Sequence, residues 1–210
     1  MKDRCVVVAG GDCDLSLLSE ISTSDFVIAA DSGLNHLMSA NVKPDLIVGD
    51  FDSYSGRLPE GIETVVLPTK KDDTDLLFSL RCGVERGFKK YLIFGGYGSR
   101  PDQNLAMLQS LVWLCDNCEA ESVKAQCNGF EINAVKNSKI TLSVGRERYF
   151  SVFSISGEAK GVEIIGADYP LENSVITPSF PIGVSNEADG EVTLSVKDGT
   201  LIIMTVDKNN

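Results

Sequence analysis

The sequence contains one histidine, His36, and this scarcity excludes any metal site built from several histidines. Its place in the expected helix SGLNHLMSA favours a structural role over a catalytic triad. Basic residues are also few, with 19 Lys and Arg against 30 Asp and Glu, so the net charge is −11. Because nucleic-acid backbones are bound through clustered basic residues, this balance argues against such a partner. It does not exclude a nucleotide, provided that a metal supplies positive charge.

Long apolar runs are lacking as well. The apolar run within MKDRCVVVAGG is far too short for a secretory signal. No segment approaches the roughly 20 apolar residues of a membrane span. We therefore expect a cytoplasmic protein with no membrane partner, whose six cysteines are reduced. Cys115 and Cys118 form a lone CxxC pair without further ligands at suitable spacing, so ordinary thiols are favoured over zinc.

The first 115 or so residues show apolar runs alternating with amphipathic segments. Strands that alternate with helices indicate a doubly wound, mainly parallel sheet in an α/β domain. The expected strands are Cys5–Ala9, Phe26–Ala30, Leu46–Val48, Glu63–Leu67 and Tyr91–Phe94. The expected helices are Leu15–Ile21, 33–40, Asp73–Arg86 and Pro101–Cys115.

Near residue 120 the apolar period falls to two, and short strands separated by Gly, Asn, Asp and Ser turns follow. This spacing is typical of an all-β sandwich or barrel. We therefore predict two domains, 1–120 and 121–210. A β domain of this size would gain from pairing with a second copy, which hides its edge strands.

Six aspartates are concentrated in two short segments that follow apolar runs. They are Asp45, Asp50 and Asp52 in KPDLIVGDFDS, and Asp72, Asp73 and Asp75 in KKDDTD. Carboxylates gathered at the carboxyl ends of parallel strands would repel one another unless a cation joined them, and Mg²⁺ suits such ligands. The plain alternatives are a solvated turn for the first segment and helix capping by Asp72 or Asp73 for the second. Three acids in four positions exceed what capping requires.

The glycine-rich turn GGYGSR precedes the helix that Pro101 is expected to open. Backbone N–H groups before a helix can cradle phosphate, and Arg100 offers a forked donor for phosphate oxygens. The turn matches neither a Walker A loop nor GxGxxG, and a plain strand-to-helix connection is the alternative. Taken alone, GVSNE at 183–187 indicates only a polar turn.

Five motifs occur in the order found in thiamine pyrophosphokinases. They are AADSG (29–33), KPDLIVGDFDS (43–53), DDTDL (72–76), GGYGSRPDQNLA (95–106) and GVSNE (183–187). The sequence resembles bacterial members of that family over nearly its whole length. The resemblance implies a catalytic ATP- and Mg²⁺-binding α/β domain, a thiamine-binding β-sandwich, and a homodimer with active sites between subunits. It implies pyrophosphate transfer from ATP to the thiamine hydroxyl, giving thiamine diphosphate and AMP.

The resemblance also implies roles for individual residues. The implied Mg²⁺ ligands are Asp50, Asp52 and Asp72. The implied catalytic residues are Asp52, Asp72, Asp75, Arg100 and Asp102. The implied ATP contacts are Thr74, Gly95, Gly98, Ser99, Arg100, Gln103 and Asn104. The implied thiamine contacts are Asp31, Tyr169, Ser185 and Asn186, with the Tyr169 ring able to stack on the cationic thiazolium.

Two departures from the family pattern matter. Many bacterial members carry His where Gln103 stands, and Gln cannot shuttle a proton, so Asp75 or Asp102 becomes the candidate general base. The Asp-Ser-Gly at 31–33 replaces the commoner Asp-Gly-Gly, which leaves the role of Asp31 open. The competing hypotheses are another Mg²⁺-dependent pyrophosphokinase or nucleotidyltransferase, and a non-catalytic thiamine or nucleotide sensor on the same scaffold.

Overall fold

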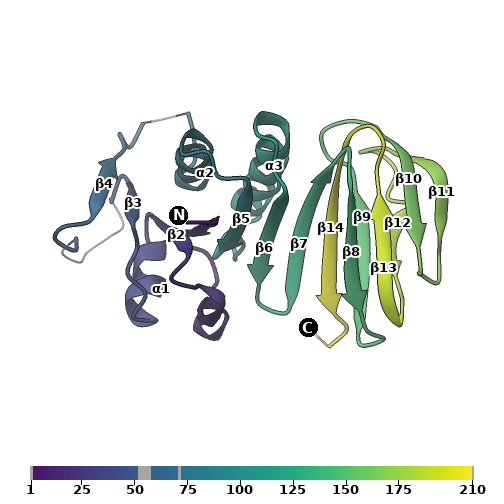
Figure 1. The fold of residues 1–210 in the computed structure, drawn as a ribbon, viewed down its shortest axis with the longest axis horizontal. Helices are drawn as coiled ribbons and strands as arrows, with labels where there is room; N and C mark the ends of the chain where they lie inside the picture. The colour runs from purple at the N-terminus through teal and green to yellow at the C-terminus, as the bar shows by residue number, and fades with distance from the viewer. Residues whose placement is uncertain (1, 52–57, 71, 210) are drawn as a thin grey trace.

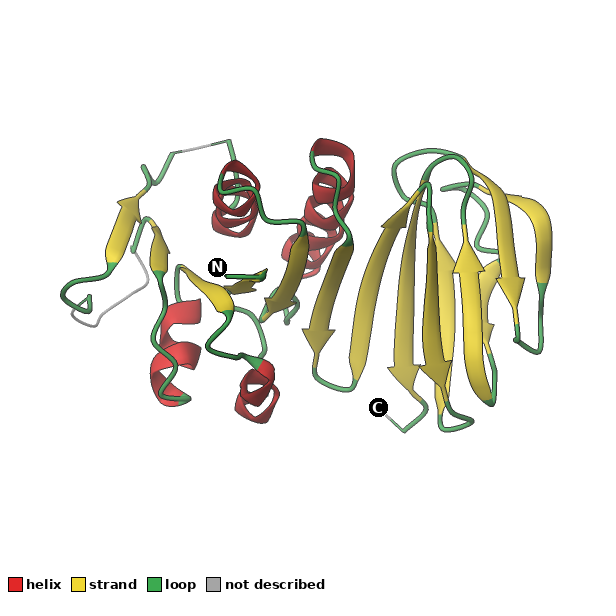
Figure 2. Ribbon diagram, in the orientation of Figure 1, coloured by secondary structure: helices red, strands yellow, loops and turns green. Residues whose placement is uncertain are grey.

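The computed structural model describes residues 2–51, 58–70 and 72–209. Its N-terminal half alternates strands and helices, as Figures 1 and 2 show. The parallel strands are β1 (Arg4–Val8), β2 (Asp25–Ala30), β3 (Leu46–Gly49), β4 (Glu63–Val66), β5 (Lys90–Phe94) and β6 (Ser122–Cys127). The helices are the 3₁₀ helix η1 (Leu15–Glu20), α1 (Gly33–Ser39), α2 (Asp75–Glu85) and α3 (Pro101–Asn117).

The C-terminal half is antiparallel and forms the predicted β-sandwich. Its strands are β7 (Phe130–Lys136), β8 (Lys139–Val144), β9 (Arg148–Phe153), β10 (Ala159–Ile165), β11 (Leu171–Ile176), β12 (Gly183–Asn186), β13 (Gly190–Ser195) and β14 (Thr200–Asp207). Within the described residues, one ten-stranded sheet has the order β12-β9-β14-β7-β6-β5-β1-β2-β3-β4. A second sheet, β11-β10-β13-β8, packs on its antiparallel end.

The large sheet continues through the predicted domain boundary. β6 pairs in parallel with β5 and antiparallel with β7, so the ladder is unbroken between the two halves. The division into 1–120 and 121–210 stays a prediction, while the predicted α/β-plus-sandwich fold class is confirmed. Two strands lack the period-two apolar pattern from which the sandwich was predicted. β11 is a largely exposed edge strand with little apolar alternation, and β12 is a four-residue strand that we expected to be a turn.

Helices cover both faces of the parallel half, as a doubly wound sheet requires. Helices α2 and α3 contribute Leu80 and Leu111 to the buried cluster on one face. On the other face, η1 and α1 contribute Leu18, Leu34 and Leu37. A third apolar cluster fills the sandwich. No helix in the described part of the chain has the length and apolar character needed to cross a membrane.

The strand order reverses beside β1, and this position matters for ligand binding. The chain moves from β1 through β2 and β3 to β4 on one side, then crosses back to place β5 on the other side of β1. In open α/β sheets the crevice outside the carboxyl ends of the strands at such a switch point is where ligands bind. The segments after β1 and β5 are therefore the expected ligand-binding segments.

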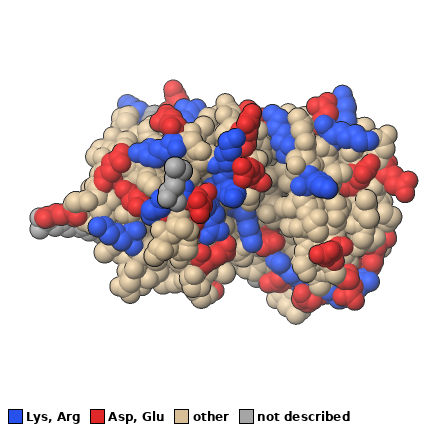
Figure 3. Space-filling view, in the orientation of Figure 1, with Lys and Arg blue, Asp and Glu red and all other residues tan. Residues whose placement is uncertain are grey.

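Charged side chains of both signs are interspersed over the face shown in Figure 3. Several form surface ion pairs, such as Lys136 with Asp116 at 2.7 Å. Exposed pairs of this kind contribute little stability, about 0–1 kcal/mol each. The fold is therefore held mainly by its three apolar clusters.

One ion pair is different because it is buried. The Asp25 carboxylate at the start of β2 is 2% exposed, and it accepts hydrogen bonds from Arg4 Nε at 3.0 Å, Arg4 Nη2 at 2.9 Å and the Ser22 N–H at 2.8 Å. Burial alone would raise the pKa of Asp25, but the Arg4 and Ser22 hydrogen bonds outweigh it and hold the pKa below 3.8. This pair joins the first two strands at their amino ends.

Replacing Asp25 with Ala is expected to reduce the free energy of unfolding by about 1–3 kcal/mol, because Arg4 and the Ser22 N–H lose their acceptor. Arg4 keeps its pair with Glu20 at 3.1 Å. In the native chain the pKa of Asp25 falls on folding, so its contribution is complete above about pH 3.8 and is lost as the pH falls through the lower folded-state value. Urea unfolding at several pH values measures both effects. The exposed neighbour Asp3→Ala is the control, with an expected change within about 0.5 kcal/mol.

Candidate active site

Two glycine-rich loops meet at the switch point. The Gly11 N–H donates to the Gly95 carbonyl at 2.7 Å, and the Asp12 N–H donates to the Tyr97 carbonyl at 2.8 Å. Gly95 has φ +60°, and a Cβ there would lie 2.2 Å from the Ala9 carbonyl oxygen. Only glycine allows these two segments of the chain to approach so closely. The arrangement places several backbone groups at one point on the carboxyl edge of the sheet.

His36 also contacts this region. His36 is a residue of α1, and its Nε2 lies 2.9 Å from the Gly11 carbonyl oxygen. This contact supports the loop after β1 and gives the single histidine a structural function.

Asn104, in the first turn of α3, shapes the second loop. Its Oδ1 accepts from the Gly98 N–H at 2.9 Å, and its Nδ2 donates to the Gly98 carbonyl at 2.8 Å. The sequence suggested Asn104 only as an ATP contact. The structure shows that its amide closes the glycine-rich turn, which spacing alone did not reveal.

Asn104→Ala is expected to lower the free energy of unfolding by about 1–3 kcal/mol, because two backbone groups of Gly98 lose their partner. If the loop holds nucleotide, the KM for ATP should rise in the same variant. Asn117→Ala is a matched control, since that amide donates to the Trp113 carbonyl at the exposed end of α3. Urea unfolding and steady-state kinetics test the pair, and equal behaviour of the two variants would contradict this role.

Arg100 and Asp102 lie at the start of α3 as an exposed pair. Their Nη2 and Oδ2 atoms are 2.5 Å apart, and the side chains are 67% and 65% exposed. The hydrogen bond between them raises the pKa of Arg100 and lowers the pKa of Asp102. Both groups are therefore charged near neutral pH. Because the pair is exposed, exchanging it for contacts to a ligand costs little. Gln103 is exposed beside them.

Acidic residues follow the neighbouring strands. Asp31 comes directly after β2 with φ +49°, and its N–H donates to the Val48 carbonyl at 2.7 Å. Asp50 comes directly after β3 and is half-buried, while Asp72 is an exposed residue beyond β4. Since β2, β3 and β4 are adjacent and parallel, all three acids belong to the same edge of the sheet.

The predicted Mg²⁺ site includes Asp52, which lies outside the described residues, as does Lys71. Within 2–51, 58–70 and 72–209, no three His, Cys, Asp or Glu side chains are grouped closely enough to hold a metal ion. The ligand set Asp50, Asp52 and Asp72 therefore stays a prediction.

The acidic segment before α2 corrects one expectation. Thr74, not Asp72 or Asp73, is the N-cap, and its hydroxyl accepts from the Leu77 N–H at 3.1 Å. Asp73 instead pairs with Arg81 at 2.7 Å, and the Arg81 guanidinium lies 5.2 Å from the centre of the Trp113 ring. The helix begins at Asp75, two residues later than predicted. Thr74 is the cap because its hydroxyl oxygen accepts a hydrogen bond from the backbone N–H three residues further along the chain.

The predicted thiamine contacts separate into two places. Tyr169, Ser185 and Asn186 line a hollow of ≈ 440 Å³ between β10, β11 and β12, together with apolar side chains. Tyr169 is 69% exposed there. Asp31 is not with them, because β2 and β12 are separated by six strands of the large sheet.

The same separation applies to the glycine-rich loops. β12 and β5 are five strand steps apart in the sheet order, which corresponds to about 24 Å at roughly 4.8 Å a step. Asn186 in β12 lies opposite Phe150 in β9. Following the register from Phe150 across β14 and β7 leads to the carboxyl end of β6. Both groups of residues thus lie at one edge of the sheet, too far apart within one chain to contact a single small molecule.

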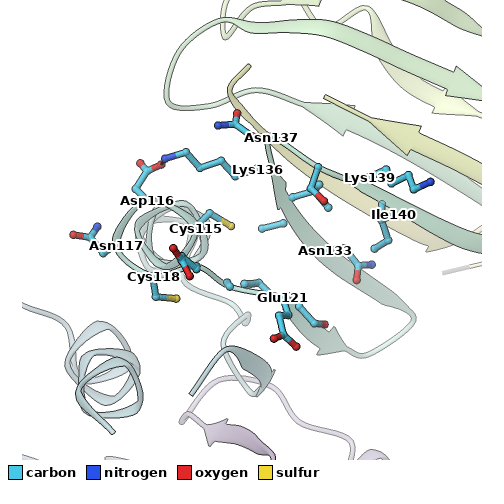
Figure 4. Close-up of a pocket in the computed structure, with 17 residues that line it drawn as sticks. Cys115, Asp116, Asn117, Cys118, Glu121, Asn133, Lys136, Asn137, Lys139 and Ile140 are labelled. Carbon is cyan, nitrogen blue, oxygen red and sulfur yellow. Dashed lines mark hydrogen bonds and ion pairs between the residues drawn. The ribbon is translucent and has the colours of Figure 1, made fainter. Parts of the chain in front are cut away.

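A larger hollow, of ≈ 570 Å³, lies at the opposite edge (Figure 4). It is lined by the end of α3, the start of β6 and the end of β7, and none of the predicted site residues is among its lining. The CxxC cysteines border it. Burial raises the pKa of Cys115 to about 12, and the Cys118 thiol donates to the Leu114 carbonyl at 3.3 Å. These contacts are those of ordinary protonated thiols.

The fold and these sites define a class: an α/β protein with a glycine- and aspartate-lined edge of its sheet, joined to a β-sandwich with its own hollow. Two family models match the chain. One describes the catalytic domain of thiamin pyrophosphokinase and matches residues 17–123. The other describes the vitamin B1 binding domain of that enzyme and matches residues 137–201. The chain belongs to the thiamin pyrophosphokinase family and is an enzyme of this type, as the sequence motifs predicted.

Individual relatives agree. A thiamine pyrophosphokinase of Bacillus subtilis (strain 168) is 28% identical over 207 residues, covering 94% of this chain and 96% of that protein. The crystal structure of thiamine pyrophosphokinase from Bacillus subtilis has a TM-score of 0.83 at 24% identity and covers 98% of this chain and 100% of its own. That of thiamin pyrophosphokinase from Geobacillus thermodenitrificans has a TM-score of 0.81 at 22% identity, with 99% of each chain covered. The two structures show the same fold.

Proposed function

We propose that this chain transfers the pyrophosphoryl group of ATP to the hydroxyl of thiamine, giving thiamine diphosphate and AMP. The observation that carries the proposal is that both family models match in order, one over the glycine- and aspartate-lined edge and the other over the sandwich hollow. In this assignment the edge binds ATP and the hollow binds thiamine. Neither competing hypothesis, a different acceptor or a sensor, is favoured by the family match.

The loop geometry suits a chain of phosphates. The loops after β1 and β5 are hydrogen-bonded to one another, and α3 begins directly after the second loop. N–H groups at a helix N-terminus attract anions. We assign the segment with Gly95, Gly98 and Ser99 to the phosphates; the Gly98 N–H itself stays with Asn104, so Gly98 serves by its lack of a side chain. Thr74 and Gln103 are assigned to the borders of the same site. Arg100 can leave its pair with Asp102 to take up charge on the transferred group.

The donor set at this edge fits Mg²⁺, which prefers carboxylate oxygens and shares its remaining positions with phosphates. Asp50, Asp52 and Asp72 would hold the ion, and when bound it neutralises negative charge on the triphosphate. Asp50 and Asp72 follow adjacent strands, so they can approach one ligand from neighbouring loops. Asp75 is the first residue of α2 and follows Asp72 by three positions.

The thiamine hydroxyl must lose a proton as it attacks the β-phosphorus of ATP, while the bond to the α-phosphate oxygen breaks and AMP leaves. Asp75 and Asp102 are the candidate bases. While Asp102 is paired with Arg100, the hydrogen bond from Arg100 lowers the pKa of Asp102 and makes it a weaker base. Positioning and charge neutralisation supply most of the catalysis in reactions of this kind.

We further propose that the working enzyme is a homodimer. One chain holds its sandwich hollow about 24 Å from its own glycine-rich loops, so thiamine in the hollow of one copy must meet ATP on the other. Three side chains that line the hollow are both apolar in character and exposed, and a second copy would cover them. They are Tyr169, Ile182 and Val184. Asp31 of one copy could then approach the cationic thiamine that Tyr169 of the other stacks upon.

The acceptor is tested by incubating the protein with ATP, Mg²⁺ and a panel of vitamin and nucleoside alcohols, and by measuring AMP release. We expect release with thiamine only. Release with another alcohol but not with thiamine would indicate a different pyrophosphokinase. Binding of ATP and thiamine without any AMP would indicate a sensor.

A further inference from the structure

The side-chain amide of Asn186 makes its hydrogen bonds to backbone groups at and near Tyr169. Its Oδ1 accepts from the Tyr169 N–H at 3.0 Å and from the Glu187 N–H at 2.9 Å, and its Nδ2 donates to the Tyr169 carbonyl at 2.7 Å. A carboxamide oxygen has two lone pairs, and both are occupied here. The side chain is also buried, with the residue 4% exposed. Little of Asn186 is left to contact a ligand.

A β-bulge gives Asn186 this direction. Gly183 pairs with Val152 and Asn186 pairs with Phe150, so β12 carries one more residue than β9 across the same span. Ser185 is in the left-handed region with φ +56°, and its N–H donates to Ser151 Oγ at 3.0 Å instead of a ladder carbonyl. Bulges of this type re-aim side chains, often beside functional sites. A left-handed backbone conformation at a serine lowers the stability of the folded protein, and the surrounding contacts must offset this cost.

The segment that carries Tyr169 is held at two further points. The Asp168 N–H donates to the Glu187 carbonyl at 2.8 Å, and the Asp168 carboxylate pairs with Arg146 at 2.5 Å. Contacts with Asn186, with the Glu187 carbonyl and with Arg146 therefore hold the backbone around Tyr169. The Tyr169 residue is 69% exposed beside the hollow. A fixed backbone that presents an exposed aromatic ring is a preorganised binding surface, and it lowers the ordering cost of binding a ligand.

We propose that Asn186 is a positioning residue: it raises affinity for thiamine by holding the Tyr169 backbone so that the ring faces the thiazolium, and not by touching thiamine itself. The inference rests on the proposed function. It assigns the direct contact to the ring of Tyr169 and the indirect one to Asn186, whereas the sequence motif placed Ser185 and Asn186 together as ligands.

A double-mutant cycle tests the proposal with Asn186→Ala, Tyr169→Ala and the double variant, each made in this chain and assayed in the same way. We expect Asn186→Ala to raise the KM for thiamine about 3- to 30-fold, the range expected when a ring–cation contact is lost. The kcat and the KM for ATP should change less than about 2-fold. In the Tyr169→Ala background the added effect should fall below about 2-fold, because no ring remains to be positioned. Tyr169→Phe should keep the dependence on Asn186.

An equal factor in both backgrounds would overturn the proposal, since a direct ligand acts whether or not the ring is present. Should Asn186→Ala fail to fold, the same cycle is run with Asn186→Asp, whose oxygens still accept from both N–H groups but oppose the Tyr169 carbonyl. The same two outcomes then apply. Failure of the proposed function looks different: the unaltered protein would form no thiamine diphosphate from ATP, whatever the cycle shows.

Discussion

Asp50→Asn is expected to lower the rate of thiamine diphosphate formation by about 10²- to 10³-fold, the size of effect seen when one charged or polar group is removed from a transition state. Asp50 comes directly after β3, between strands whose carboxyl ends also carry Asp31 and the segment before Asp72. The amide keeps the shape of the side chain and loses its charge, so the Mg²⁺ concentration needed for half-maximal rate should rise. The melting temperature should change by only a few degrees, since Asp50 is half-buried at a loop.

Asp45→Asn is the matched control, because it removes a second charge from the same segment. The Asp45 carboxylate accepts from the Val27 N–H at 2.8 Å and pairs with Lys2 at 3.1 Å, at the amino end of β3. These contacts are structural, so the variant should lose some stability and keep its activity. If Asp50→Asn kept full activity at ordinary Mg²⁺, the ligand assignment would be wrong.

Two inactive variants should restore activity when they are mixed. Asp50→Asn removes the acid from the ATP edge, and Tyr169→Arg places a cation where cationic thiamine should bind. If each active site combines the edge of one copy with the hollow of the other, a mixed dimer contains one intact site. After subunit exchange of equal amounts, about a quarter of the native activity should return, because half of the dimers are mixed and each has one of two sites.

The control mixes each variant with itself and should give no recovery. Kinetics after exchange in mild urea, followed by dilution, provide the measurement. Absence of any recovery, with subunit exchange shown by differential labelling, would mean that each site is built within one chain. That result would contradict the separation of β12 and β5 as the reason for dimerisation.

Local patterns were enough to predict most elements of the parallel half. Strands β1, β2, β3 and β5 were predicted because each is a short apolar run, as expected of a buried strand, and residues such as Val6 and Val7 in β1 are indeed buried. The start of α2 was predicted two residues too early, because several side chains that can cap a helix follow one another and only their other contacts decide among them. Asp73 is drawn to Arg81, which leaves Thr74 to cap.

The sandwich was predicted as a class and not in detail. β11 exposes most of its side chains and β12 contains a bulge at Ser185, so neither shows the strict alternation that identifies a strand. The continuity of one sheet through both halves depends on the pairing of β6 with both β5 and β7. Pairing between strands is a tertiary property, and a single sequence does not contain it in any local pattern.

For the site, the motifs predicted which loops matter but not what each side chain does. Asn104 and Asn186 were both expected to contact ligands, and both use their amides on backbone groups of neighbouring loops. Asparagine is suited to that task because its amide both donates and accepts, as backbone groups do. Nothing in the spacing distinguishes an amide that faces a ligand from one that faces a turn.

The central claim is that the β- and γ-phosphates of ATP move together to thiamine. ATP labelled at the β-phosphorus, with Mg²⁺ and thiamine, tests it directly. We expect all of the transferred label in thiamine diphosphate, with unlabelled AMP formed in equal amount. Label left in ADP beside thiamine monophosphate, or no labelled thiamine product at all, would contradict the account.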